Sequence, residues 1–245
     1  VVTTQNGVLA PAHAATAVPF SRVLAGICRV VTFIGESDSE AIEMLPKPAD
    51  IRIGEAYSAD GQELVSADSE RVRRITQVLS VCEGVTCSIC APSAWTELWT
   101  KAAASASFSI AALCRAPLDV LATQPETKVL LEGGIAEAVR CGKAAGHVSE
   151  EEDAIIERLV TYFSKSEPGT TPSTLRDVVV GSPSEMRELL GGIREAGTRL
   201  GVATPVHDFV YAALLPQELR ARGTRPYTLL GVPGGAPHIE VGSRF

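Results

Sequence analysis

The spacing of apolar residues changes near residue 91 and divides the chain into two parts. In the first part, short runs rich in Val and Ile, bounded by turn-forming residues, predict β-strands. Apolar residues at helical spacing predict one helix over 68–82. Strands that alternate with a helix indicate an α/β layer, which we expect over 1–91. The predicted strands cover 1–4, 22–35, 51–54 and 85–90.

The second part has apolar positions at the spacing of α-helices and therefore predicts an all-helical domain over 92–220. One helix is expected to begin directly after Pro92. A tail rich in Gly and Pro, 221–245, is expected to be extended or loose. The other predicted helices cover 125–141, 149–163, 182–200 and 206–215.

Two of these helices have recognisable start signals. Ser149 with Glu152, and Ser182 with Glu185, match the Ser-x-x-Glu capping box found at helix N-termini. Gly201 follows the last apolar position of the later helix and is its expected end.

Composition removes several classes of function. Hydrophobic residues make up 45% of the chain, but no apolar run approaches the ~20 residues of a membrane helix. The net charge is −7, and the sequence contains no block of basic residues. Both observations argue against nucleic-acid binding. Cys87 and Cys90 form a CxxC, but no second pair or histidine follows at the spacing of a zinc site. We expect ordinary reduced thiols in a cytoplasmic protein without metal, with a redox pair as the alternative.

Lys101 is the one charged residue between Thr100 and Cys114. On a helix, Ser105 and Ser109 would share its face, since they follow it by four and eight residues. A lysine in such a place either extends from a buried helix into water or acts in a cleft as a proton donor or anion anchor. The spacing leaves both interpretations open.

Three segments in order, TTQNGV at 3–8, ELWTK at 97–101 and GVATPVHDFVYAAL at 201–214, resemble the ketopantoate reductases (2-dehydropantoate 2-reductases). The resemblance extends over about residues 1–216. It implies that the α/β layer is part of a Rossmann domain for NADPH, and that the helical domain is similar to the C-terminal domain of 6-phosphogluconate dehydrogenase. It also implies reduction of a small 2-oxo acid, as in pantothenate biosynthesis, and a possible homodimer.

The same resemblance implies roles for individual residues. Lys101 matches the catalytic lysine that protonates the developing alkoxide. Asn6 and Glu185 match residues that contact the cofactor, although a plain Asn-Gly turn and a capping box would also explain them. Ser173 matches a serine that binds the substrate.

Ser105 and Ser109 stand where well-studied family members have asparagines. They are expected to bind substrate with shorter groups that lack amide donors, which leaves open which 2-oxo acid is used. Thr170 likewise replaces an expected asparagine, and the segment 172–174 is Pro-Ser-Thr where the family has Ser-Ser-Met.

The glycine-rich loop of a dinucleotide site, G-x-G-x-x-G, has no match in the chain, because no two glycines are separated by a single residue. The chain also opens at Val1 without a Met. We therefore expect an incomplete enzyme whose 245 residues alone bind NADPH weakly. The alternative is a non-catalytic helical module, derived from the same family, that serves in dimerisation or interaction.

Overall fold

The computed structural model describes residues 1–30, 32–34, 42–44 and 48–225. They form two compact units. The first consists of Val1–Ala103 and Ala138–Glu150, and the second of Ala104–Glu137 and the described residues from Glu151 on. The predicted tail lies almost wholly outside the described residues.

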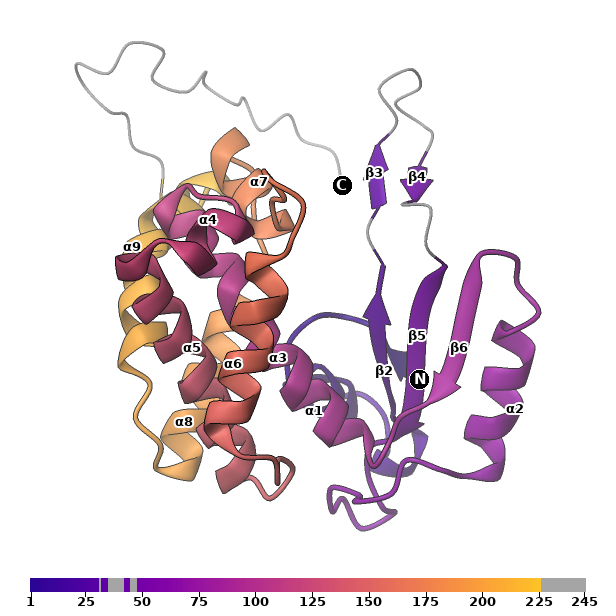
Figure 1. Ribbon diagram of the computed structural model, residues 1–245. Helices are drawn as coiled ribbons and strands as arrows, with labels where there is room; N and C mark the ends of the chain where they lie inside the picture. Colours follow the sequence, from indigo (N-terminus) through magenta and orange to yellow (C-terminus); the bar gives the residue numbers. More distant parts are fainter. Residues whose placement is uncertain (31, 35–41, 45–47, 226–245) are drawn as a thin grey trace. The chain divides into compact units, whose positions relative to one another are not determined.

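The first unit contains a four-stranded sheet in the order β1-β2-β5-β6. β1 and β2 are parallel, β2 and β5 antiparallel, and β5 and β6 parallel. Helix α2 lies along β6 (Figure 1). The α/β layer predicted from the sequence is therefore confirmed. The elements are β1 Val2–Thr3, β2 Leu24–Arg29, β5 Ala49–Glu55, α2 Glu70–Leu79 and β6 Val85–Ile89.

The two faces of this sheet bury different side chains, because successive residues of a strand point in opposite directions. On one face, Leu24 and Ile53 pack with Val72 of α2. On the other face, Ala25 and Ile27 pack with Trp95 of helix α3 (Ala94–Cys114). The indole Nε1 of Trp95 donates a hydrogen bond of 2.8 Å to the backbone oxygen of Ala56. The start of α3 is thus part of the sheet's core.

The single strand predicted over 22–35 is wrong, because this stretch forms two strands. β2 ends at Arg29, which pairs with Asp50, the second residue of β5. β3 (Thr32–Ile34) instead pairs with β4 (Ile42–Met44) in a separate antiparallel ribbon.

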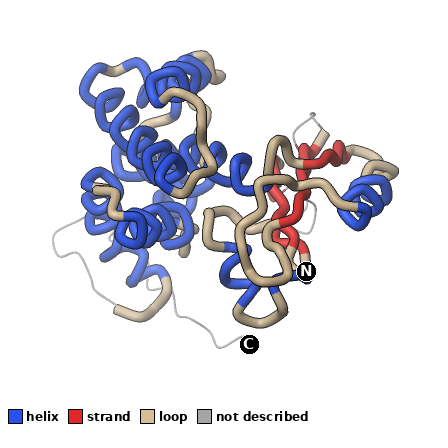
Figure 2. Tube along the Cα trace, turned by 90° about the horizontal axis from the view of Figure 1, so that it is seen from below, coloured by secondary structure: helices blue, strands red, loops and turns tan. Residues whose placement is uncertain are grey.

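Helices make up the second unit, whereas the strands gather in the first (Figure 2). The core of the second unit is aliphatic and includes Leu131, Leu190 and Ile193. Gly201, with φ of 69°, ends α8 as predicted. The helices here are α4 Leu118–Thr123, α5 Pro125–Ala144, α6 Glu152–Ser164, α7 Ser173–Val180, the π-helix η2 Arg187–Gly191, α8 Gly192–Leu200 and α9 Pro205–Ala221, while α1 Ala10–Ala15 and η1 Phe20–Arg22 belong to the first unit.

Both predicted capping boxes are wrong. α6 begins at Glu152 with Glu151 as its N-cap, because Ser149 still lies in the connection whose residues His147 and Val148 hydrogen-bond back to Gly142.

The later box fails for a similar reason. Ser182 belongs to the end of α7, where its amide donates to the backbone oxygen of Asp177. Ser184 takes the capping role, since its hydroxyl accepts from the Met186 amide while the carboxylate of Glu218 holds it.

Candidate active site

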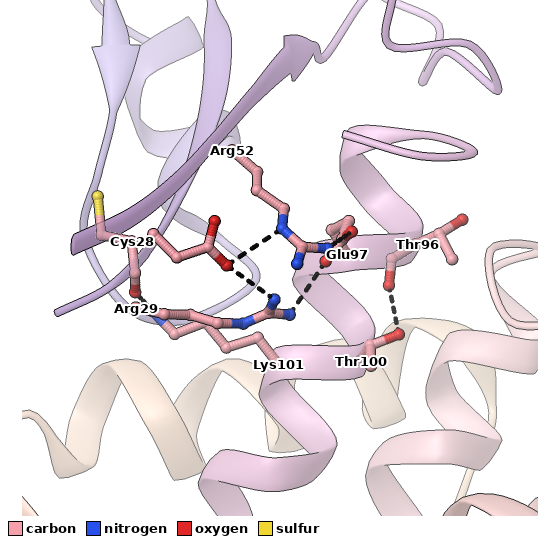
Figure 3. Close-up of polar contacts among 8 residues, drawn as sticks. Cys28, Arg29, Arg52, Thr96, Glu97, Thr100 and Lys101 are labelled. Carbon is pink, nitrogen blue, oxygen red and sulfur yellow. Dashed lines mark hydrogen bonds and ion pairs between the residues drawn. The ribbon is translucent and has the colours of Figure 1, made fainter. Parts of the chain in front are cut away.

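Lys101 lies two turns into α3, and its ammonium group is directed at the sheet. The Nζ atom donates a hydrogen bond of 2.6 Å to the backbone oxygen of Cys28, near the end of β2 (Figure 3). Lys101 and Cys28 are both half-buried. Burial raises the pKa of the Cys28 thiol, the Lys101 charge opposes this rise, and Asp50 adds to it. The cation is therefore kept beside the strand end by a neutral acceptor.

Four further charged residues form a closed ring next to this lysine (Figure 3). Glu97 accepts from Arg52 at 2.6 Å through Oε1 and from Arg29 at 3.1 Å through Oε2. Asp50 Oδ2 lies 3.4 Å from Arg29 Nη1 and 3.3 Å from Arg52 Nε. We call Arg29, Asp50, Arg52 and Glu97 the charge ring.

The register of the strands explains why the ring forms. Arg29 and Asp50 are directly opposite each other in the β2–β5 ladder, so their side chains share a face. Arg52, two residues further along β5, points to that face as well. Glu97 meets them from α3, one helical turn before Lys101.

Two arginines surround the buried carboxylate of Glu97. Only 7% of Glu97 is exposed, and an isolated carboxylate there would be costly. Its hydrogen bond raises the pKa of Arg52, and the charge of Asp50 adds to the rise. Two positive and two negative members make the ring as a whole neutral.

Asn6 is half-buried and follows β1 at the carboxyl end of the strand. Because β1 and β2 are parallel, with Thr3 opposite Ala25, Asn6 and Cys28 belong to the same edge of the sheet. This is the edge at which α/β sheets bind ligands. Gly7, with φ of 94°, supplies the left-handed residue that the turn requires.

The other predicted site residues belong to the second unit. Ser105 and Ser109 continue the Lys101 face of α3, and both are buried. Ser173 is the first residue of α7 and Glu185 precedes η2; both are half-buried.

The surroundings of Glu185 are acidic. Burial raises the pKa of the Asp177 carboxyl, and the nearby charge of Glu185 raises it further. Arg176 opposes this rise and Glu218 adds to it. Glu185 thus lies within electrostatic range of α7, the helix that Ser173 begins.

Sequence reasoning missed the charge ring. The sequence does place Glu97 on the helix face of Lys101, because Glu97 precedes Lys101 by four residues. Arg29 and Arg52 also stand out, as charged residues in strands that are otherwise apolar. Only the strand register shows that they converge.

The positions of the two CxxC cysteines argue against a redox pair. Cys87 packs on the α2 face of the sheet and Cys90 on the α3 face, and both thiols are free. Burial raises the pKa of Cys90 to about 12.

In the part of the chain that the structure describes, no three His, Cys, Asp or Glu side chains gather as a metal site would require. No helix within the same residues is long and apolar enough to cross a membrane.

A family model, the C-terminal domain of ketopantoate reductase PanE/ApbA, matches residues 93–218. The dimeric ketopantoate reductase from Staphylococcus aureus has a TM-score of 0.72 at 17% identity, covering 90% of this chain and 68% of that one. The 2-dehydropantoate 2-reductase from Methylococcus capsulatus has a TM-score of 0.71 at 25% identity, covering 90% of this chain and 70% of that one. The structure of a D-mandelate dehydrogenase with NADH and anilino(oxo)acetate has a TM-score of 0.71 at 13% identity, covering 91% of this chain and 68% of that one. Comparison with curated protein sequences gives no match.

These structures and this chain share one fold, a Rossmann-like sheet unit and a helical domain. The family model covers more than half of the chain. The chain belongs to the ketopantoate reductase (PanE/ApbA) family.

Proposed function

We propose that this chain forms the proton-donating part of an NADPH-dependent reductase of a small 2-oxo acid, with Lys101 as the proton donor. The observation that carries the proposal is the ammonium group of Lys101, held 2.6 Å from the Cys28 carbonyl at the carboxyl edge of the sheet. Family membership supports the reaction class.

The chemistry asked of Lys101 follows from charge. When a ketone is reduced, its oxygen gains negative charge, and a nearby ammonium group stabilises that charge and supplies the proton. The acceptor that holds Lys101 at the strand end, the Cys28 carbonyl, carries no charge. An ammonium group has three N–H donors, so Lys101 would donate to the substrate oxygen without releasing the Cys28 carbonyl.

The described residues fit the nicotinamide end of a dinucleotide site. Asn6 follows β1 at the edge of the parallel pair, where such cofactors bind, and it would orient the nicotinamide. Glu185 is the second proposed cofactor contact, on the strength of the family resemblance. The bound cofactor would supply the hydride. The preference for NADPH over NADH is part of the proposal.

Ser105, Ser109 and Ser173 are the proposed substrate contacts. Hydroxyl groups at 105 and 109 reach less far than asparagine amides, so we propose a 2-oxo acid other than ketopantoate as the preferred substrate. A role in pantothenate biosynthesis, a homodimer and a cytoplasmic location stay proposals from family membership.

The proposal is tested in a fusion protein that takes its glycine-rich loop from a relative. The segment of the Methylococcus capsulatus relative that precedes its equivalent of Val1 is fused to this chain, and NADPH oxidation is measured with a panel of 2-oxo acids. We expect turnover with at least one acid. Replacing Ser105 and Ser109 by Asn should shift the ratio of kcat/KM values toward ketopantoate.

Matched controls separate failure of the fusion from failure of the proposal. The fusion should bind NADPH, as shown by fluorescence titration, whether or not it turns over. A fusion that binds NADPH but oxidises it with none of the acids would contradict the proposal and favour the non-catalytic module.

A further inference from the structure

We propose that Glu97 is a positioning residue for Lys101. Its carboxylate bridges Arg29 and Arg52, and this bridge fixes the first turns of α3 against the ends of β2 and β5, where the Cys28 carbonyl receives the ammonium. The inference rests on the proposed function, since positioning matters for activity only if Lys101 is the proton donor.

The first support is that the two oxygens of Glu97 have separate partners. Oε1 takes Arg52 at 2.6 Å and Oε2 takes Arg29 at 3.1 Å. The carboxylate therefore ties one helix to two neighbouring strands. Asp50 joins the same two guanidinium groups from the other side and closes the ring.

The second support is that the ring and the lysine contact share their backbone. Arg29 directly follows Cys28 in β2, and Glu97 lies one turn before Lys101 in α3. A rotation of α3 that breaks the Glu97 bridge would also move Lys101 away from the Cys28 carbonyl. The two contacts are two points of attachment between the same strand and the same helix.

The third support is that Glu97 is buried and needs both of its carboxylate oxygens for the bridge. An exposed ion pair contributes little to stability, but Glu97 is buried and hydrogen-bonded on both oxygens. Glutamine at this position would keep the shape, but it has a single acceptor oxygen and turns an NH₂ group toward one arginine. Glu97→Gln therefore removes one arm of the bridge with little change in volume.

The chain itself offers a selective probe of the Cys28 carbonyl. Two Cys–Arg dipeptides occur in the sequence, Cys28–Arg29 and Cys114–Arg115. Labelling with [1-¹³C]Cys and [¹⁵N]Arg gives one carbonyl–amide correlation for each in an HNCO spectrum. Cys114→Ser removes one signal and so assigns both, and the Cys114 signal serves as an internal control.

Lys101→Met should move the Cys28 carbonyl resonance upfield, since a carbonyl that loses a charged donor is less polarised. Glu97→Gln and Arg52→Gln should each move it in the same direction by a smaller amount. Arg73→Gln, which removes a surface ion pair with Asp68 in the same unit, should leave it in place.

Two results would overturn the positioning role of Glu97. A Cys28 resonance that stays in place in Glu97→Gln, while Lys101→Met moves it, would overturn the positioning role. A resonance that Lys101→Met does not move would overturn it as well, because the contact would then be absent. If Glu97→Gln does not fold, Arg52→Gln decides in the same way.

This measurement uses the 245-residue chain and needs no turnover, so it is independent of the proposed function. If the fused enzyme is active, Glu97→Gln should lower kcat more than it changes KM, and Arg73→Gln should change neither. A shifted resonance in a chain without reductase activity would leave the positioning of Lys101 intact and refute its catalytic use.

Discussion

Two buried carboxylates in the first unit each have more than one hydrogen-bond partner. Glu97 has two arginines, and Glu55 has Arg71 together with the hydroxyl of Ser69. Burial by itself would raise the pKa of Glu55, but these hydrogen bonds outweigh it and hold the pKa below its usual value. The paired form of Glu55 therefore favours the folded state.

Glu55→Gln should lower the free energy of unfolding at pH 7 by about 1.5–3 kcal/mol, the range for hydrogen bonds to a charged group. Because the folded-state pKa of Glu55 is lowered, its stabilisation is present above the unfolded value of 4.5 and is lost as pH falls through the folded value. Urea titrations at pH 7 and pH 3 should show the variant's deficit shrinking at low pH. An equal deficit at both pH values would contradict this, and exposed Glu83→Gln is the control.

What the sequence predicts at the residue scale depends on the distance between partners along the chain. Lys101 and its neighbours on the helix face follow from a four-residue spacing. The acceptor at Cys28 is 73 residues from Lys101, and Arg29 and Arg52 are 68 and 45 residues from Glu97, so only the strand register brings them together. Local patterns therefore predict the lysine but not the ring.

At the scale of elements, long periodic segments were predicted well and their ends less so. α3, α5 and α9 appear where apolar spacing placed them. The six-residue helices α1 and α4 are too short to show a period, and both were missed. The capping serines failed because contacts from distant residues, such as Glu218 to Ser184, decide which hydroxyl caps a helix.

The close packing of α3 on the sheet depends on Gly54. A Cβ atom at this position would lie 2.5 Å from the Cβ of Ala67 and 3.1 Å from that of Ala94. Gly54→Ala should therefore cost about 1–3 kcal/mol, as overpacking of a core does. Gly191→Ala is the control, since its nearest neighbour is 3.6 Å away. Thermal unfolding of both variants checks this, and equal melting temperatures would contradict it.

At the scale of the whole molecule, the sheet core does not end at residue 91. Ala94, Trp95 and Leu98 of α3 cover the sheet face that Val23 and Ala25 present. A fragment of residues 1–90 should therefore aggregate, because that face and the strand edges are left uncovered. A fragment of residues 1–103 retains the cover and should aggregate less. Light scattering of the purified fragments decides, and a monomeric 1–90 fragment would contradict this account.

The most direct test of the central claim is the turnover number of the fused reductase with Lys101 replaced by Met. Loss of general acid catalysis should lower kcat by about 10²–10⁴-fold. Lys128→Met, which replaces a partly exposed lysine of α5, is the matched control and should leave kcat unchanged. A Lys101→Met enzyme that binds NADPH and turns over as fast as the control would contradict the assignment of Lys101 as the proton donor.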